Sequence, residues 1–235
     1  MRGVIITGPP KADLAEVDVL AGLGVATVHE AMGRKGSLGS RLRPIQQGAA
    51  IGGTAVTALC WPGDNLMIHA AVEQCGPGDV LVVSTTSPSR DGLFGELFAT
   101  ALRRRGVRGL VINAGVRDVK ALRDMGFAVW SAAVSAQGTV KATAGSVNVP
   151  LVVEGEVIRP GDAVLADDDG VVCVPREQVS TTVSAARART EKEAAARAAF
   201  EAGELGLDRY GLRETLSTLG VEYLTFEEYE KRSGT

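Results

Sequence analysis

Three short apolar runs alternate with helix-like segments through the middle third of the sequence, and this rhythm constrains the fold more than any other feature. Segments 91–105 and 116–125 predict helices between the runs. The runs themselves have the length of buried strands, and they are residues 80–84, 109–113 and 127–134. Strands that alternate with helices form parallel sheets with crossover connections. The sequence therefore predicts an α/β fold.

The flanking segments extend this core. Before it, the sequence predicts a helix over 13–33 with Asp13 as N-cap, a strand over 51–59 and a helix over 66–75. After residue 138 the pattern changes to a β-meander or small barrel, with strands at 149–153, 156–158, 163–166 and 171–174. Residues 176–202 predict a long helix. We therefore expect one domain over residues 1–235, with 176–235 as a C-terminal helical extension.

Composition excludes several classes of protein. The formal net charge is −3 with no long basic run, which argues against nucleic-acid binding. The apolar runs are far shorter than the ~20 residues that cross a membrane. The three cysteines, Cys60, Cys75 and Cys173, are far apart, which argues against a disulfide framework or a zinc site. No signal peptide is evident after Met1, so a cytoplasmic enzyme or binding protein is expected.

Arg117 and Asp118 come soon after the apolar run 109–113. Ligands of open α/β sheets bind outside the carboxyl ends of the strands. The planar fork of arginine matches a carboxylate, and aspartate is a hard oxygen ligand that suits Mg²⁺ or Mn²⁺. The same pair would also serve as an ordinary ion pair in the first turn of the following helix, so these residues alone leave both interpretations open.

Gly95, Glu96 and Leu97 follow the preceding strand in the same way. If the strands at 80–84 and 109–113 are neighbours, both helix starts face one crevice. Free N–H groups from Gly95 to Leu97 could then hold a carboxylate, and Glu96 could face a metal ion or a water. Glu96 would equally be a favourable first-turn acid beside the helix dipole.

Asn65 and His69 form a third candidate set. They are four residues apart, so they share one face of the predicted helix 66–75 and could reach one pocket. A single histidine on a largely apolar helix is also commonly a core residue, and the sequence does not decide between these roles.

The spacing of these segments resembles a known family. Twenty residues separate Glu96 from Arg117-Asp118, which matches an acidic-X20-Arg-Asp signature. Further matching segments are Gly63-Asp64-Asn65, 145–150, 160–162 and 166–171. Over roughly residues 15–215 the chain resembles the 4-hydroxy-4-methyl-2-oxoglutarate / 4-carboxy-4-hydroxy-2-oxoadipate aldolases. These are class II pyruvate aldolases, related to the regulator of ribonuclease E activity.

The resemblance implies an α-β-β-α sandwich, assembled as trimers or hexamers with active sites between subunits. It also implies Mg²⁺ or Mn²⁺ as cofactor and an oxo-acid as substrate. The implied reaction releases pyruvate and a second oxo-acid, with oxaloacetate decarboxylation as a second activity.

The resemblance also suggests roles by matching position. Asp118 would hold the metal, largely through waters, and Arg117 would bind the pyruvate oxygens and stabilise the enolate. Backbone amides near Gly95 to Leu97 would take the pyruvate carboxylate, and Glu96 would order a water for proton transfer. Asn65 and His69 match polar positions near the pocket, and Glu193 or Glu191 would reach the metal from a neighbour's C-terminal helix.

Two other functions compete with the aldolase. A ribonuclease regulator shares the fold but usually lacks the aspartate after the arginine and the C-terminal extension, whereas this chain has Asp118 and the 205–208 segment. Asn113 and Ala114 depart from the family, since Asp and Gly are common there. A methyltransferase would need a Gly-rich cofactor loop with an acidic partner, and the sequence contains none.

Overall fold

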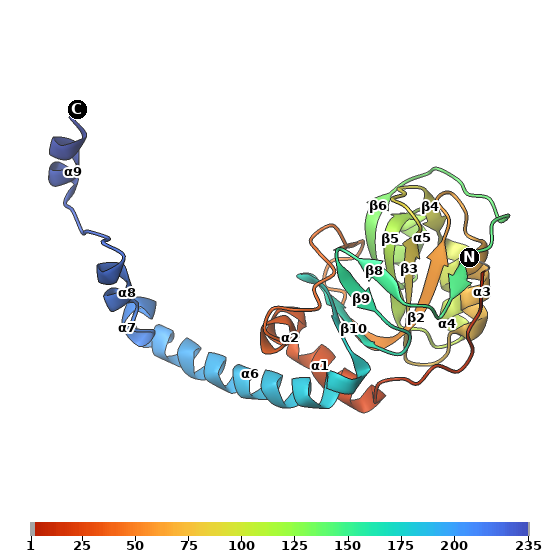
Figure 1. Ribbon diagram of the computed structural model, residues 1–235, viewed down its shortest axis with the longest axis horizontal. Helices are drawn as coiled ribbons and strands as arrows, with labels where there is room; N and C mark the ends of the chain where they lie inside the picture. The colour runs from red at the N-terminus through yellow and green to blue at the C-terminus, as the bar shows by residue number, and fades with distance from the viewer. Residues whose placement is uncertain (1–2, 235) are drawn as a thin grey trace. The chain divides into compact units, whose positions relative to one another are not determined.

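The structure is a computed structural model that describes residues 3–234. The chain forms two compact units, with the boundary between Arg189 and Thr190 (Figure 1). The first unit holds the sheets and most of the helices, and the second is helical. The fold class is the expected α/β sandwich with a C-terminal helical extension.

The elements of the first unit follow in chain order: α1 (Leu14–Leu23), α2 (Val25–Ala31), β1 (Arg43–Pro44), β2 (Ile51–Cys60), α3 (Leu66–Gln74), β3 (Asp79–Thr85), β4 (Gly92–Phe94), α4 (Glu96–Arg104), β5 (Gly109–Val116), α5 (Val119–Asp124), β6 (Ala128–Val134), β7 (Ser146–Val147), β8 (Leu151–Val153), β9 (Glu156–Ile158), β10 (Ala163–Asp167), β11 (Gly170–Val174), a 3-10 turn (Arg176–Gln178) and the beginning of α6 (Val179–Glu201).

In the described part of the chain the main sheet has nine strands, in the order β1-β6-β5-β3-β2-β10-β11, with β4 beside β5 and β7 beside β2. Strands β2, β3, β5 and β6 are parallel to one another. Val80 of β3 pairs with Gly109 of β5, which in turn pairs with Ala128 of β6. The strands at 80–84 and 109–113 are therefore neighbours, which is the condition under which both helix starts face one crevice. Their carboxyl ends meet at one edge of the sheet.

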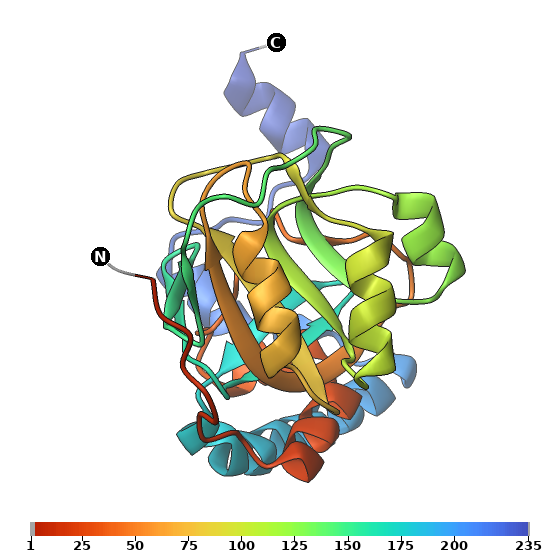
Figure 2. The same ribbon diagram turned by 90° about the vertical axis from the view of Figure 1, so that its right-hand side faces the viewer.

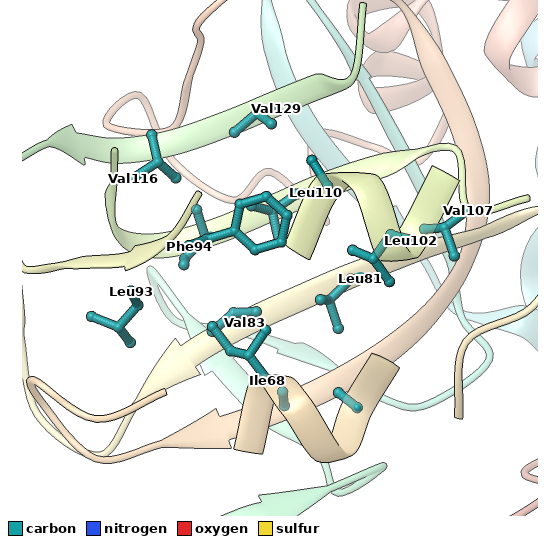
Figure 3. Packing of buried hydrophobic residues seen from close by; sticks show 14 of the residues in the cluster. Ile68, Leu81, Val83, Leu93, Phe94, Leu102, Val107, Leu110, Val116 and Val129 are labelled. Carbon is teal, nitrogen blue, oxygen red and sulfur yellow. The ribbon is translucent and has the colours of Figure 1, made fainter. Parts of the chain in front are cut away.

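Helices α3, α4 and α5 cover one face of the sheet, and Figure 2 shows α3 and α4 lying across it. Alternate residues of the central strands, such as Leu81 and Leu110, point to this side (Figure 3). They pack against Ile68 of α3 and Leu102 of α4. Each fully buried leucine or isoleucine contributes about 1.5–3 kcal/mol relative to exposure, so this layer fixes both helices on the sheet.

The opposite face carries a second core. Val82, Val111 and the fully buried Trp130 pack against Leu151 and Ile158 of the β8–β9 hairpin. Farther along the sheet, α1, α2 and the first turns of α6 form a third core with β10 and β11. Both faces of the parallel strands are thus buried, which explains their nearly continuous apolar sequence.

Several predicted boundaries are wrong. Gly92–Phe94 is strand β4, not the first turn of a helix, because Phe94 pairs beside β5 and is fully buried. Helix α5 begins at Val119, not Val116, because β5 continues to Val116. Gly24, at φ 87°, divides the expected helix 13–33 into α1 and α2. Asp13 is the N-cap, as predicted, and accepts the N–H of Glu16 at 3.0 Å.

The late strands also differ from the predicted meander. β8 and β9 form a separate two-stranded sheet, whereas β10 and β11 join the main sheet as antiparallel strands beside β2. Main-chain pairing with β2 binds these late strands to the early part of the chain, a contact that no local pattern reveals.

The second unit contains the rest of α6 and three short helices, α7 (Gly206–Arg209), α8 (Leu212–Thr218) and α9 (Phe226–Ser233). A capping box formed by Thr225 and Glu228 begins α9. None of the residues in these three helices is buried. Several large apolar side chains of the second unit are exposed, and Leu219, Tyr223 and Phe226 are the most exposed of them, at 72–74%. Within residues 3–234, no helix combines the length and apolar character needed to cross a membrane.

Candidate active site

A pocket of about 230 Å³ opens where β5 ends, between α3 and α4. Its lining contains most of the residues that the sequence singles out, and they are Asn65, His69, Val72, Gly95, Leu97, Phe98, Ala101, Arg117, Asp118 and Lys141. A shallower hollow on the far side of Arg117 and Asp118 is lined by Val119 and residues 134–136. The fold thus brings together residues from four separate segments at the predicted edge of the sheet.

Arg117 and Asp118 lie at the centre of this region. The N–H of Arg117 donates to the carbonyl of Phe94 at 2.9 Å, which fixes the backbone as it leaves β5. Asp118 has the left-handed conformation, with φ 56° and ψ 33°. Non-glycine residues rarely adopt it, and such strain is concentrated at functional sites. The side chains are 46% and 43% exposed, with Arg117 Nε 3.7 Å from Asp118 Oδ2.

Gly95 leaves room for the Asp118 carboxylate. A Cβ on Gly95 would lie 2.3 Å from Asp118 Oδ2 and 3.1 Å from Arg117 Cγ. The backbone of Gly95, at φ −158°, is an extended conformation open to any residue. Space alone therefore favours glycine here.

The first turn of α4 supplies backbone donors beside the carboxylate. The N–H of Glu96 donates to Asp118 Oδ2 at 3.1 Å. The N–H groups of Leu97 and Phe98 have no partner within residues 3–234. Unpartnered amides at a helix N-terminus, together with the helix dipole, favour an anion. The side chain of Glu96 is exposed and does not line the pocket.

Asn65 and His69 reach the pocket from α3, as their spacing predicts. Asn65 is 5% exposed and donates from Nδ2 to the carbonyl of Leu93 at 3.0 Å, while its Oδ1 has no partner among the described residues. The His69 ring lies 4.5 Å from the ring of Phe98. Burial, and in smaller part the charge of Lys141, lowers the pKa of His69 below its usual 6.5. The neutral form of His69 therefore predominates at pH 7.

Lys141 lines the pocket but was missed by the sequence analysis. It belongs to the long connection between β6 and β7, and no helical or strand periodicity marks that connection. The carboxylate of Asp64 holds this connection in place, because it accepts hydrogen bonds from the N–H groups of Ala142 at 2.8 Å and Thr143 at 2.7 Å. The Gly63-Asp64-Asn65 segment was the available sequence signal for this loop. Its aspartate is buried, and a buried carboxylate needs hydrogen-bond donors, here from backbone elsewhere in the chain.

The donor set fits a divalent ion bound mainly by water and substrate. Asp118 is the acidic residue in the pocket lining, and its Oδ1 has no recorded partner within residues 3–234. Mg²⁺ typically retains several waters and binds one or two carboxylates. No three His, Cys, Asp or Glu side chains of the described chain come together as a complete metal site. Glu191 and Glu193 belong to the second unit, so their expected contact with a neighbour's metal remains a prediction.

Comparisons with known proteins identify the family of the chain. A model of the RraA-like family, described as Aldolase/RraA, matches residues 25–173. A protein of Halalkalibacterium halodurans, provisionally named 4-hydroxy-4-methyl-2-oxoglutarate aldolase, is 25% identical over 83% of this chain and 95% of its own length. A Burkholderia multivorans protein with the same provisional name is 37% identical over 56% of this chain and 79% of its own length.

A solved structure gives a further likeness. Streptomyces coelicolor RraAS2, described as an unusual member of the RNase ES inhibitor RraA family, is 26% identical. It matches with a TM-score of 0.74 over 81% of this chain and 99% of its own.

Proposed function

The chain belongs to the RraA-like, Aldolase/RraA family, and on that premise we propose that it is a divalent-metal-dependent pyruvate aldolase. Its substrate would be 4-hydroxy-4-methyl-2-oxoglutarate or 4-carboxy-4-hydroxy-2-oxoadipate, and its products pyruvate and a second oxo-acid. One observation carries the proposal. A strained Asp118, a half-exposed Arg117 and two free amides of α4 lie around one pocket.

Binding would use the positive groups of the pocket. The N–H groups of Leu97 and Phe98 would donate hydrogen bonds to the C1 carboxylate of the substrate. The guanidinium of Arg117 would face the C2 oxygen, where negative charge develops as the bond breaks. A metal held by Asp118 would supply a Lewis acid for the same oxygen.

Cleavage needs the proton of the C4 hydroxyl to leave. Glu96 lies between the lining residues Gly95 and Leu97, and its exposed side chain would order a water at the mouth of the pocket that takes this proton. The C3–C4 bond then breaks, C4 becomes a carbonyl, and the electron pair forms the enolate of pyruvate, which Arg117 stabilises. Protonation of the enolate at C3 gives pyruvate. Oxaloacetate would form the same enolate on losing CO₂, so decarboxylation is the expected second activity.

The remaining pocket groups would select the tail of the substrate. Lys141 provides a cation and His69 a neutral imidazole on the side of the pocket formed by α3. A second carboxylate on the substrate would pair with Lys141. Both proposed substrates carry such a carboxylate beyond the bond that breaks.

We also propose that the site is completed by a neighbouring copy in a trimer or hexamer. The second unit exposes aromatic and aliphatic side chains, including Leu219, Tyr223 and Phe226. Contact with another subunit would bury them. Packed on a neighbouring subunit, this segment would place Glu193 or Glu191 near the metal of that subunit.

The likeness to RraAS2 favours a second candidate, a protein that binds and inhibits a ribonuclease. Coupled detection of pyruvate distinguishes the two functions. The wild-type protein is offered a panel of 4-hydroxy-2-oxo acids and oxaloacetate, with Mg²⁺ or Mn²⁺ and with a chelator. An aldolase releases pyruvate only with the metal, whereas a purely regulatory protein gives no metal-dependent turnover.

A further inference from the structure

A second pocket, of about 270 Å³, lies at the carboxyl edge of the same parallel strands. It shares no lining residue with the candidate active site. Its lining combines one loop with residues of neighbouring elements, and consists of Arg41, residues 84–90, Asn113, Ala132 and Val152. The active-site proposal uses none of these residues.

The floor of this pocket is a polar pair on an otherwise apolar sheet face. Val82 and Val111 belong to the core beneath the β8–β9 hairpin. Side chains alternate along a strand, so Ser84 and Asn113, two residues later, point to that same face. Val83 pairs with Ile112, which makes Ser84 and Asn113 neighbours. The pocket therefore opens on the face opposite α3 and α4.

The side chains of Ser84 and Asn113 make no hydrogen bond to the described part of the chain. Ser84 is only 4% exposed, and neither its hydroxyl nor the amide of Asn113 has a hydrogen-bond partner within residues 3–234. Polar groups at such positions normally find a partner. A ligand or ordered water is the available partner for both.

The charge of the lining selects an anion. Arg90 and Arg41 line the pocket, and no acidic residue of the described part of the chain belongs to its lining. Arg41 pairs with Glu154 at 2.5 Å, whereas Arg90 has no ion pair among the described residues. The hydroxyl groups of Thr85, Thr86 and Ser87 add further hydrogen-bonding groups, whereas that of Ser89 donates to Asp91. Arginine forks match carboxylate oxygens, so this lining favours a carboxylate over an uncharged aromatic or aliphatic ligand.

The loop that carries Arg90 is seated firmly on β5. The N–H of Gly115 donates to the carbonyl of Asp91 at 3.1 Å. A Cβ on Gly115 would lie 2.3 Å from the carbonyl oxygen of Arg90, so the loop backbone lies directly against the strand. The wall of the pocket is thus held by the sheet before any ligand binds.

We propose that this pocket binds a small organic dicarboxylate, with one carboxylate on Arg90 and the hydrogen-bonding floor of Ser84 and Asn113 beneath it. The volume suits a ligand of a few carbons, below the usual range of pockets for larger ligands. The proposal is independent of the aldolase activity, because the two pockets lie on opposite faces of the sheet.

Isothermal titration with succinate as probe tests this site. The titrated proteins are the wild type, Arg117→Ala, Arg90→Gln, Ser84→Ala and, as a matched control, Arg104→Gln. Arg104 is an exposed arginine of α4 outside both pockets. Arg117→Ala removes binding in the candidate active site and so isolates the second pocket. Thermal unfolding of each variant establishes that it is folded.

The expected result is succinate binding that persists in Arg117→Ala and in Arg104→Gln. Arg90→Gln should weaken it about tenfold or more, since one charge-assisted hydrogen bond contributes about this factor. Ser84→Ala should weaken it by a smaller factor. Loss of all binding in Arg117→Ala, up to about 10 mM succinate where a millimolar site is mostly filled, would overturn the proposal. Unchanged binding in a folded Arg90→Gln variant would also overturn it.

Discussion

The carboxylate of Asp118 accepts a hydrogen bond from the backbone N–H of Glu96 at 3.1 Å, although 22 positions separate the two residues. This contact gives the long motif spacing a physical meaning. Glu96 begins α4, and Asp118 follows the end of β5. The spacing between them is therefore the length of chain that passes through α4 and β5. The contact uses the backbone of Glu96, and the glycine before it leaves room for the carboxylate.

Gly95→Ala should displace the Asp118 carboxylate and leave the fold intact. The new Cβ would lie 2.3 Å from Oδ2, the end of a side chain that can turn away, and the Gly95 backbone is extended. We expect kcat to fall by about 10²-fold, the loss typical of one preorganised group. Gly22→Ala in α1 is the control, because no atom lies within 4 Å of its Cβ position. A Gly95→Ala enzyme with wild-type kcat would refute the crowding argument.

Lys141→Ala should impair only substrates with a second carboxylate. The lysine lines the pocket and lies near enough to His69 to lower its pKa, and we expect it to bind the tail. For 4-hydroxy-4-methyl-2-oxoglutarate we expect KM to rise about tenfold or more, the value of a charge-assisted hydrogen bond. The matched substrate is 4-hydroxy-2-oxopentanoate, which lacks the second carboxylate and should show little change. An equal rise for both substrates would exclude a tail-binding role.

The ring of His69 should titrate below its usual pKa of 6.5, because burial and the Lys141 cation both disfavour the charged imidazolium. Proton NMR of the ring as a function of pH measures this directly. Lys141→Ala removes the smaller of the two causes, so the pKa of His69 should rise part of the way toward 6.5. Lys141→Arg keeps the charge and should leave the pKa low. A wild-type pKa of 6.5 or higher would contradict the described surroundings of His69.

Asp64→Ala should destabilise the protein, because it deprives three backbone N–H groups of their acceptor. We expect a loss of about 3 kcal/mol in the free energy of unfolding at pH 7, measured with urea. Burial alone would raise the pKa of Asp64, but the N–H groups of Leu66, Ala142 and Thr143 together lower it below its ordinary 3.8. The exposed Asp124→Ala is the control and should change little.

The pH dependence of the same variant has a defined sign. A carboxyl with a lowered folded-state pKa contributes its full stability above the unfolded value, near pH 4, and loses it as the pH falls through the folded value. The difference between wild type and Asp64→Ala should therefore be constant near neutral pH and shrink below about pH 4. A difference that grows in acid would show that the charge of Asp64 does not stabilise the loop.

The parallel centre of the fold was predictable because strands 80–84 and 109–113 are continuous apolar runs, the local pattern of strands that are buried on both faces. Strand β4 was not, since Gly92–Phe94 becomes a strand only through pairing with β5. The same limit applies to the site. Asn65 and His69 follow from their spacing on one helix, and Arg117 and Asp118 from their position after a strand. Lys141, in contrast, reaches the pocket through a loop held by the distant Asp64.

Pyruvate release from 4-hydroxy-4-methyl-2-oxoglutarate, followed by coupled oxidation of NADH with lactate dehydrogenase, tests the central claim most directly. The assay compares wild type, Arg117→Ala and the exposed-arginine control Arg104→Ala, each with Mg²⁺ and with a chelator. We predict metal-dependent release by the wild type and the control, and a loss of about 10²–10³-fold in Arg117→Ala. Release that survives the chelator, or that Arg117→Ala retains at the wild-type rate, would contradict the assignment of this pocket as a metal-dependent aldolase site.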